Sequence, residues 1–289
     1  MAKIVSDLIF DIGLYDGDDT AYYLHQGYRV VAVDANPYMI EGGKQRFAAE
    51  IKAGRLTLVN HAISTSGGEV VRFHVSDVPS WSSVHEAAAS RNGTGFKAVE
   101  VSTVRIDRLF EEHGVPYYLK VDIEGNDRLV LAGLSREFQP KYVSAESECQ
   151  GDKAVLTEEE SIENLELLNK AGYTRFKMIR QGDFSAVRAT KLGKFLQRLA
   201  NSATHGRMKN TPVISALGAP FSDRAVVEKI GYDFFKNDSG SGPWGEQLPG
   251  RWMDYATARR VYLEGRRAYF AQPVTPDAFS YWFDWHATY

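Results

Sequence analysis

Leu8-Ile9-Phe10-Asp11-Ile12-Gly13-Leu14-Tyr15-Asp16-Gly17 is an apolar run that gives way to a glycine turn rich in acidic residues. The run Leu8–Phe10 predicts a buried parallel strand, because such strands are apolar on both faces. Gly13 and Gly17 allow the backbone to turn sharply and to approach a ligand closely. The pattern over Thr20–Gln26 then suits a helix. Strand, glycine turn and helix together predict the opening unit of an α/β domain.

The same alternation continues to about residue 180. Further strand-like runs are found at Arg29–Val33, Leu56–Val59, Val70–Val75, Tyr117–Val121, Tyr142–Glu146 and Thr174–Ile179. Helical patterns between them are found at Pro37–Ala49, Ile106–Phe110 and Leu165–Ala171. This alternation predicts a doubly wound α/β domain with a central, mostly parallel sheet. Ligands of such domains bind at the carboxyl ends of the strands, so the functional site is expected there.

Composition indicates a folded, soluble chain of ordinary charge. The 289 residues are 44% hydrophobic and carry a formal net charge of -3, which gives no reason to expect nucleic-acid binding. The single cysteine, Cys149, excludes an intramolecular disulfide and favours a reducing compartment. The sequence has no apolar run long enough for a membrane span and no signal-peptide pattern at its start. We therefore expect a cytoplasmic protein, which could form a homo-oligomer.

After about residue 180 the character of the sequence changes. The strand and helix alternation fades, and four of the five tryptophans follow: Trp244, Trp252, Trp282 and Trp285. We expect a cofactor-binding core at residues 1–180. Residues 181–289 are then an aromatic-rich C-terminal appendage, which we expect to act as a lid or cap on the substrate side.

The glycine turn carries the first indication of a ligand. A dinucleotide-binding turn has the pattern Gly-x-Gly-x-x-Gly, but Tyr15 stands at the position of the middle glycine. Three acids, Asp11, Asp16 and Asp18, crowd the same turn. Carboxylates repel an anionic pyrophosphate and attract a cation, such as the sulfonium and ammonium groups of S-adenosylmethionine. The sign of the charge therefore favours S-adenosylmethionine over NAD.

Asp34 ends the second predicted strand. An acidic side chain at this point can accept hydrogen bonds from both ribose hydroxyls of an adenosine. The same geometry serves NAD, so Asp34 predicts adenosine binding in general. An NAD-linked oxidoreductase remains the alternative function.

A second polar segment, Leu119–Asp127, follows the strand predicted at Tyr117–Val121. It contains Lys120, Asp122 and Glu124, where an apolar strand passes into a loop. Here the sequence resembles the FkbM family of class I S-adenosylmethionine-dependent methyltransferases. The hallmark of that family is a Lys-x-Asp-x-Glu-Gly segment after an Asp-x-Gly-x-x-x-Gly loop, and the resemblance covers roughly Leu8 to Ile179.

The resemblance implies a Rossmann-like class I methyltransferase fold and assigns roles to particular residues. The expected cofactor-binding residues are Asp11, Gly13, Asp16, Gly17, Asp34 and Ala62, with Ala62 near the adenine. Asp122 is expected close to the reacting methyl group. The family loop commonly reads Asp-x-Gly-Ala-Asn-x-Gly, so the pair Leu14-Tyr15 is a departure from it.

The expected reaction is O-methylation of a sugar, a nucleotide-sugar or a natural product. A carboxylate or imidazole near the acceptor hydroxyl would take up its proton, and the candidates are Asp122, Glu124 and His286. A divalent ion held by Asp122 and Glu146 could instead help the hydroxyl to lose its proton by lowering the pKa of that hydroxyl. The sequence has no compact ligand cluster and does not favour this alternative.

The remaining candidates concern the small-molecule or glycan acceptor. We expect contacts from the following side chains: Lys120, Glu146, Trp244, Trp282 and Asp284. A binding module that keeps the methyltransferase fold without its activity is a further alternative.

Overall fold

The computed structural model of the chain describes residues 2–123, 125–147, 157–181, 184–193, 195–196, 235, 240–271 and 283–289. The chain forms two compact units. The first unit contains Met1–Ala145 and Lys170–Gly172, and the second contains Glu146–Asn169 and Tyr173–Tyr289. The expected division of roles at residue 180 stays a prediction, because compactness does not report which residues bind a ligand.

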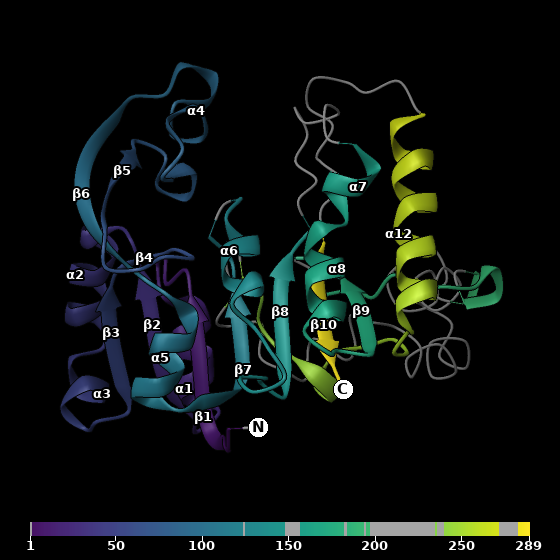
Figure 1. The fold of residues 1–289 in the computed structure, drawn as a ribbon, viewed down its shortest axis with the longest axis horizontal. Coiled ribbons are helices and arrows are strands. Elements are labelled where there is room, and N and C mark those ends of the chain that lie inside the picture. The colour runs from purple at the N-terminus through teal and green to yellow at the C-terminus, as the bar shows by residue number, and fades with distance from the viewer. Residues whose placement is uncertain are drawn as a thin grey trace, which may run out of the picture. The chain divides into compact units, whose positions relative to one another are not determined.

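The first unit is built on a parallel sheet (Figure 1). Its strands are β1 (Ile4–Ile12), β2 (Arg29–Asp34), β3 (Leu56–Asn60), β7 (Val115–Val121) and β8 (Tyr142–Glu146). They lie in the order β3-β2-β1-β7-β8, and every neighbouring pair is parallel. The predicted Rossmann-like α/β fold with a mostly parallel sheet is confirmed.

Helices connect these strands. They are α1 (Asp18–His25), α2 (Pro37–Arg46), α3 (Ala48–Lys52), α5 (Ile106–His113) and α6 (Asp127–Ala132). The start of α2 is fixed locally, because the Asn36 side chain accepts a hydrogen bond from the Tyr38 amide and Pro37 occupies the first turn.

The core of the first unit lies against β1 and β7. Ile9, Phe10 and Leu119 are completely buried, as expected for central parallel strands that are covered on both faces. From α5, the ring of Phe110 packs 5.3 Å from that of Phe10. The apolar run that opens the sequence therefore forms the centre of the sheet.

A separate three-stranded sheet has the order β4-β6-β5. Its strands are β4 (Ala62–Ile63), β5 (Val70–Ser76) and β6 (Phe96–Val104), and short helices lie between β5 and β6: η1 (Pro79–Trp81), α4 (Glu86–Ala89) and η2 (Arg91–Gly93). The strand predicted at Val70–Val75 is present, and it pairs antiparallel with β6. No strand was predicted over β6, whose polar face breaks the apolar run that marks a buried strand.

The second unit contains a different set of elements. They are α7 (Glu158–Ser161), α8 (Glu163–Lys170), β9 (Arg175–Ile179), η6 (Gly245–Gln247), α12 (Tyr255–Phe270) and β10 (Asp284–Thr288). β10 pairs antiparallel with β9, and this pairing places His286 opposite Lys177. Within the described residues, no helix is both long and apolar enough to cross a membrane.

Candidate functional site

The glycine loop after β1 touches the end of β7. Gly13 has φ +96°, and a Cβ atom on it would lie 1.9 Å from the backbone oxygen of Asp122. The Gly13 amide donates to the carbonyl of Val33, and the Asp122 amide donates to that of Ile12. Only glycine fits where the loop passes against the backbone of Asp122. Through these contacts the loop predicted to hold a ligand joins the ends of β1, β2 and β7.

The departure at Leu14-Tyr15 has a structural consequence. Leu14 is buried, and its side chain lies within contact distance of the positions where Gly17 and Gly43 would carry a Cβ. Tyr15 has φ +47°, a left-handed conformation that asparagine adopts more easily than tyrosine. The Tyr15 amide donates to Asp34 Oδ2 at 2.9 Å, so the tyrosine keeps the loop bound to β2.

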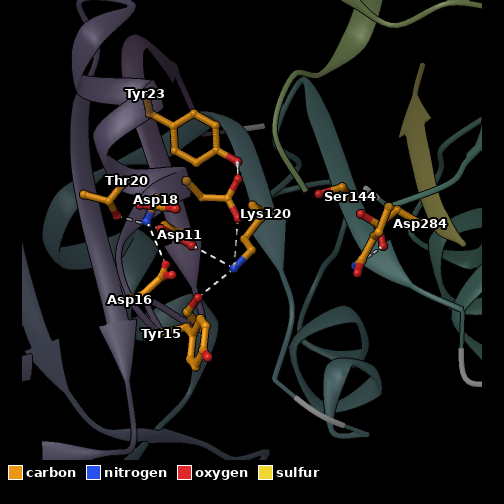
Figure 2. Close-up of polar contacts among 12 residues, drawn as sticks. Asp11, Tyr15, Asp16, Asp18, Thr20, Tyr23, Lys120, Ser144 and Asp284 are labelled. Carbon is orange, nitrogen blue, oxygen red and sulfur yellow. Dashed lines mark hydrogen bonds and ion pairs between the residues drawn. The ribbon is translucent and has the colours of Figure 1, made fainter. Parts of the chain in front are cut away.

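Lys120 lies beneath the loop (Figure 2). Its Nζ donates to the Gly13 carbonyl at 2.6 Å and lies 3.1 Å from Asp11 Oδ1, as an ion pair. Thr20 Oγ1 donates to the other oxygen of Asp11 at 2.6 Å, and Asp19 lies 3.7 Å from the ammonium. Burial alone would lower the pKa of Lys120, but the carboxylates around it raise the pKa above its ordinary value. The buried ammonium therefore neutralises Asp11 and holds the loop.

Asp34 ends β2 with each carboxyl oxygen on a backbone amide. Oδ2 accepts from Tyr15, and Oδ1 accepts from Asn36 at 2.7 Å. Burial raises the pKa of Asp34 to about 6, although both amides and Lys120 act in the opposite direction. The Asn60 side chain donates to the Asp34 carbonyl, which fixes the strand end. A carboxylate held in one orientation and short of cationic partners is suited to accept hydrogen bonds from a ligand.

Two further acids of the loop differ in their partners. Asp18 forms an ion pair with Arg46 at 2.8 Å, and Arg46 also donates to the Asp16 carbonyl. The carboxyl group of Asp16 accepts a hydrogen bond from the Asp18 amide at 3.1 Å. Burial of this group and the negative charge of Asp18 raise the pKa of Asp16.

Asp122 follows β7 and is partly buried. Burial raises the pKa of Asp122, Lys120 acts against this increase, and Asp19 adds to it. The turn after it is closed by Asp127, which accepts from the Ile123 amide at 2.9 Å. The structure thus brings Asp122 to the same sheet edge as Gly13 and Asp34, whereas Glu124 lies outside the described residues.

Ala62 lies in β4 and is buried against Phe73 and Val101. Its expected place near an adenine stays a prediction.

The candidates from the second unit are mostly buried. Trp244 and Asp284 have almost no exposed surface, and Asp284 accepts a hydrogen bond from Gln181 at 2.7 Å. Glu146 is buried, and its backbone oxygen accepts from the Asn164 side chain. Trp282 lies outside the described residues. The predicted contacts of these four residues with an acceptor stay untested.

His286 also lies in the second unit, in β10. It is 1% exposed, and neither ring nitrogen has a hydrogen-bond partner within the described residues. Burial and the charge of Lys177 lower the pKa of His286 to about 3. Lys177 donates to the carbonyls of Gly245 and Leu248, and burial lowers the pKa of this lysine to about 8. The expected role of His286 as a proton acceptor stays a prediction.

Sequence reasoning missed three residues of the first unit. Thr20 and Asp19 complete the surroundings of Asp11 and Lys120, and their position in the first turn after an acidic glycine loop was the available signal. His85 forms a hydrogen bond to Asn126, which lies 41 positions later, and no local pattern predicts such a contact.

Among the described residues, no group of three or more metal-ligating side chains is close enough to hold a metal ion.

Comparison with known proteins gives one match. Residues 11–174 match the family model described as the methyltransferase FkbM domain. The matched range contains both the glycine loop and the segment after β7. The comparison with curated proteins gave no match.

Proposed function

This chain belongs to the FkbM methyltransferase family, and from that premise we propose that it uses S-adenosylmethionine to methylate a hydroxyl group. The acceptor class is a sugar, a nucleotide-sugar or a natural product. The observation that carries the choice of cofactor is the gathering of carboxyl groups at the ends of β1, β2 and β7, where the ammonium of Lys120 is already held by Asp11 and the Gly13 carbonyl.

A raised pKa means that the charged form of the group lacks compensation in the free protein. Asp16, Asp34 and Asp122 share this property, and the nearby Lys120 is already engaged with Asp11 and Gly13. A cation bound among them would favour their ionised forms, whereas a pyrophosphate would add repulsion. This charge balance supports S-adenosylmethionine and does not support the oxidoreductase alternative.

The residues present fit that cofactor. When bound, it supplies a methyl group carried on a positively charged sulfur. Asp34 would accept hydrogen bonds from the ribose hydroxyls, and Gly13 lets the loop pass directly against the backbone of Asp122, which keeps the two segments of the site together. Lys120 keeps the loop in place through its bond to the Gly13 carbonyl. Asp122 would lie beside the acceptor and help to orient its hydroxyl, which is where much of the rate of such a displacement arises.

Calorimetric titration of the protein with S-adenosylmethionine, and separately with NAD, tests the proposal. We expect binding of the first ligand only. Asp34→Ala should weaken it by roughly 10-fold to 100-fold, since a hydrogen bond to a charged group contributes about 1.5–3 kcal/mol. Asp7→Ala is the matched control, because Asp7 is an exposed acid of β1 paired with Arg29. Equal affinities in wild type and Asp34→Ala would refute the assigned cofactor site.

The acceptor is found by incubating the protein with methyl-labelled cofactor and a cell extract, followed by mass spectrometry. Labelled hydroxyl-bearing products are expected. A protein that binds the cofactor and labels nothing in extracts of several growth conditions would indicate the non-catalytic binding module instead.

A further inference from the structure

The segment between β5 and β6 holds an imidazole in a fixed place. The backbones of His74 and Ser83 exchange two hydrogen bonds, of 2.8 and 3.0 Å, which tie this segment to β5. Two residues later, the His85 amide donates to the Ser83 hydroxyl at 3.2 Å. A further hydrogen bond, from the Ser76 hydroxyl to the Ala89 carbonyl, joins the end of β5 to the end of α4. His85 is therefore carried by an anchored backbone.

Among the described residues, one hydrogen-bond partner orients the side chain of His85. Its Nε2 lies 3.0 Å from Oδ1 of Asn126. An amide oxygen only accepts, so Nε2 carries the proton and Nδ1 has a free lone pair. Among the described residues no group forms a hydrogen bond to Nδ1, and His85 as a whole is exposed. Asn126 is only 6% exposed, so the acceptor in this pair is the fixed member.

This pair lies at the edge of the sheet that carries the cofactor residues. Asn126 follows Asp122 by four residues, so their Cα atoms are at most about 14 Å apart. The turn between them is compact, because Gly125 has φ +85° and Asp127 accepts from the Ile123 amide. Figure 1 shows α4, which begins directly after His85, beyond the carboxyl ends of β2 and β3.

We infer that His85 is the proton acceptor of the methyl transfer and that Asn126 is its positioning residue. The inference rests on the proposed function. In the step, a lone pair of the acceptor oxygen forms the bond to the methyl carbon while the bond from carbon to sulfur breaks and its electron pair stays on the now neutral sulfur. The hydroxyl proton goes to Nδ1 of His85. Because His85 is exposed, the imidazolium then returns this proton to water.

His85 is better placed for this step than the other candidates. Asp122 is partly buried, whereas His85 is exposed and its Nδ1 has no hydrogen-bond partner among the described residues. His286 is enclosed in the second unit. The competing explanation for His85 is structural, namely that its bond to Asn126 only tethers the segment before α4. That explanation predicts lost stability on mutation and no specific loss of turnover.

The first experiment needs no acceptor. The ring 13Cε1 resonance of His85 is assigned by its loss in His85→Gln, and it is recorded with saturating S-adenosylmethionine and with saturating S-adenosylhomocysteine, which lacks the positive charge. We expect the resonance to differ between the two complexes. The resonance of His25, at the far end of α1, should be the same in both. Binding of both ligands with no difference at His85 would overturn the inference alone. Absence of binding would overturn the proposed function, and the inference with it.

The second experiment measures label transfer from methyl-labelled cofactor to the small-molecule fraction of an extract. His85→Gln should lower the rate at least 100-fold, the usual contribution of a positioned base. Its cofactor affinity and melting temperature should match the wild type. Asn126→Leu should lower the rate about 10-fold, and Asn126→Asp should restore it, because a carboxylate oxygen also accepts from Nε2. His25→Gln is the control with unchanged transfer. A rate in His85→Gln within threefold of wild type, or a loss explained by unfolding in all three variants, would refute the assignment.

Discussion

Replacing Lys120 by methionine removes the cation that forms an ion pair with Asp11, while keeping a side chain of similar length. In the native protein Lys120 is 3% exposed, and its ammonium lies 3.1 Å from Asp11, which is itself fully buried. It also binds the Gly13 carbonyl at 2.6 Å. The variant would leave a buried carboxylate without its counter-charge and a loop carbonyl without its donor.

The expected cost follows from this burial. Removing one partner of a buried ion pair destabilises a protein by about 3–5 kcal/mol, because the remaining charge is desolvated and uncompensated. For a unit of this size, 1 kcal/mol corresponds to a change of about 2–4 °C in melting temperature. Lys120→Met should therefore lower the melting temperature of the first unit by roughly 10 °C.

The assay is thermal unfolding followed by circular dichroism, with Lys44→Met as the matched control. Lys44 forms an ion pair of 3.2 Å with Glu41, nearly the same length, but both side chains are more than half exposed. Exposed pairs contribute little, so the control should melt close to wild type. In a double-mutant cycle, Asp11→Asn and Lys120→Met together should cost about 1–3 kcal/mol less than the sum of the single changes. Compensation stays incomplete, because Asp19 also faces the ammonium.

Equal small effects of Lys120→Met and Lys44→Met would refute the reasoning, since burial could then not be the source of the cost. Strict additivity in the cycle would refute the pairing of Lys120 with Asp11 specifically.

Three further predictions concern pH and packing. Affinity for S-adenosylmethionine, measured by calorimetry, should rise between pH 5 and 7, because the pKa of Asp34 is raised to about 6 and the bound ligand favours its ionised form; a flat profile would contradict this role. Gly13→Ala should lower the free energy of unfolding, measured in urea, by about 2 kcal/mol more than Gly27→Ala does. Both glycines have positive φ, but only at Gly13 would the added Cβ lie 1.9 Å from the backbone oxygen of Asp122. The free energy of unfolding should fall as the pH is lowered from 6.5 toward 3, because His286 takes up a proton in the unfolded chain but, with a pKa of about 3, not in the folded chain. His286→Leu should reduce this loss of stability in acid unfolding experiments. An unchanged acid profile in the variant would contradict the prediction.

Some of the site follows from the sequence because local physics decides it. An apolar run followed by glycines can only be a buried strand and a sharp turn, and parallel strands bring their carboxyl ends to one edge. Asp34 and Asp122 were placed by that rule, and both lie where it puts them. Gly13 was expected to let the backbone approach a ligand, which stays a prediction, and the structure shows that it lets the loop approach the backbone of Asp122.

Other features depended on contacts between distant segments. Lys120 was expected to bind substrate, which stays a prediction. The folded chain makes it the buried partner of Asp11, and no sequence pattern reports burial at a strand end. The C-terminal appendage was expected to act as a lid or cap, which stays a prediction, and its last described segment forms strand β10 paired with β9. Its pairing decides its structure, because Trp, His and Thr in alternation fit several local conformations.

The sequence by itself determined the parallel sheet, the glycine loop and the sign of the charge around it, since each follows from residues close together in the chain. Tertiary structure alone decided which of those charges are already compensated and which residue orients the exposed imidazole of His85. Compensation depends on distances and desolvation between residues far apart in sequence, as between His85 and Asn126 or between Lys120 and Asp11. Those quantities exist only once the chain is folded.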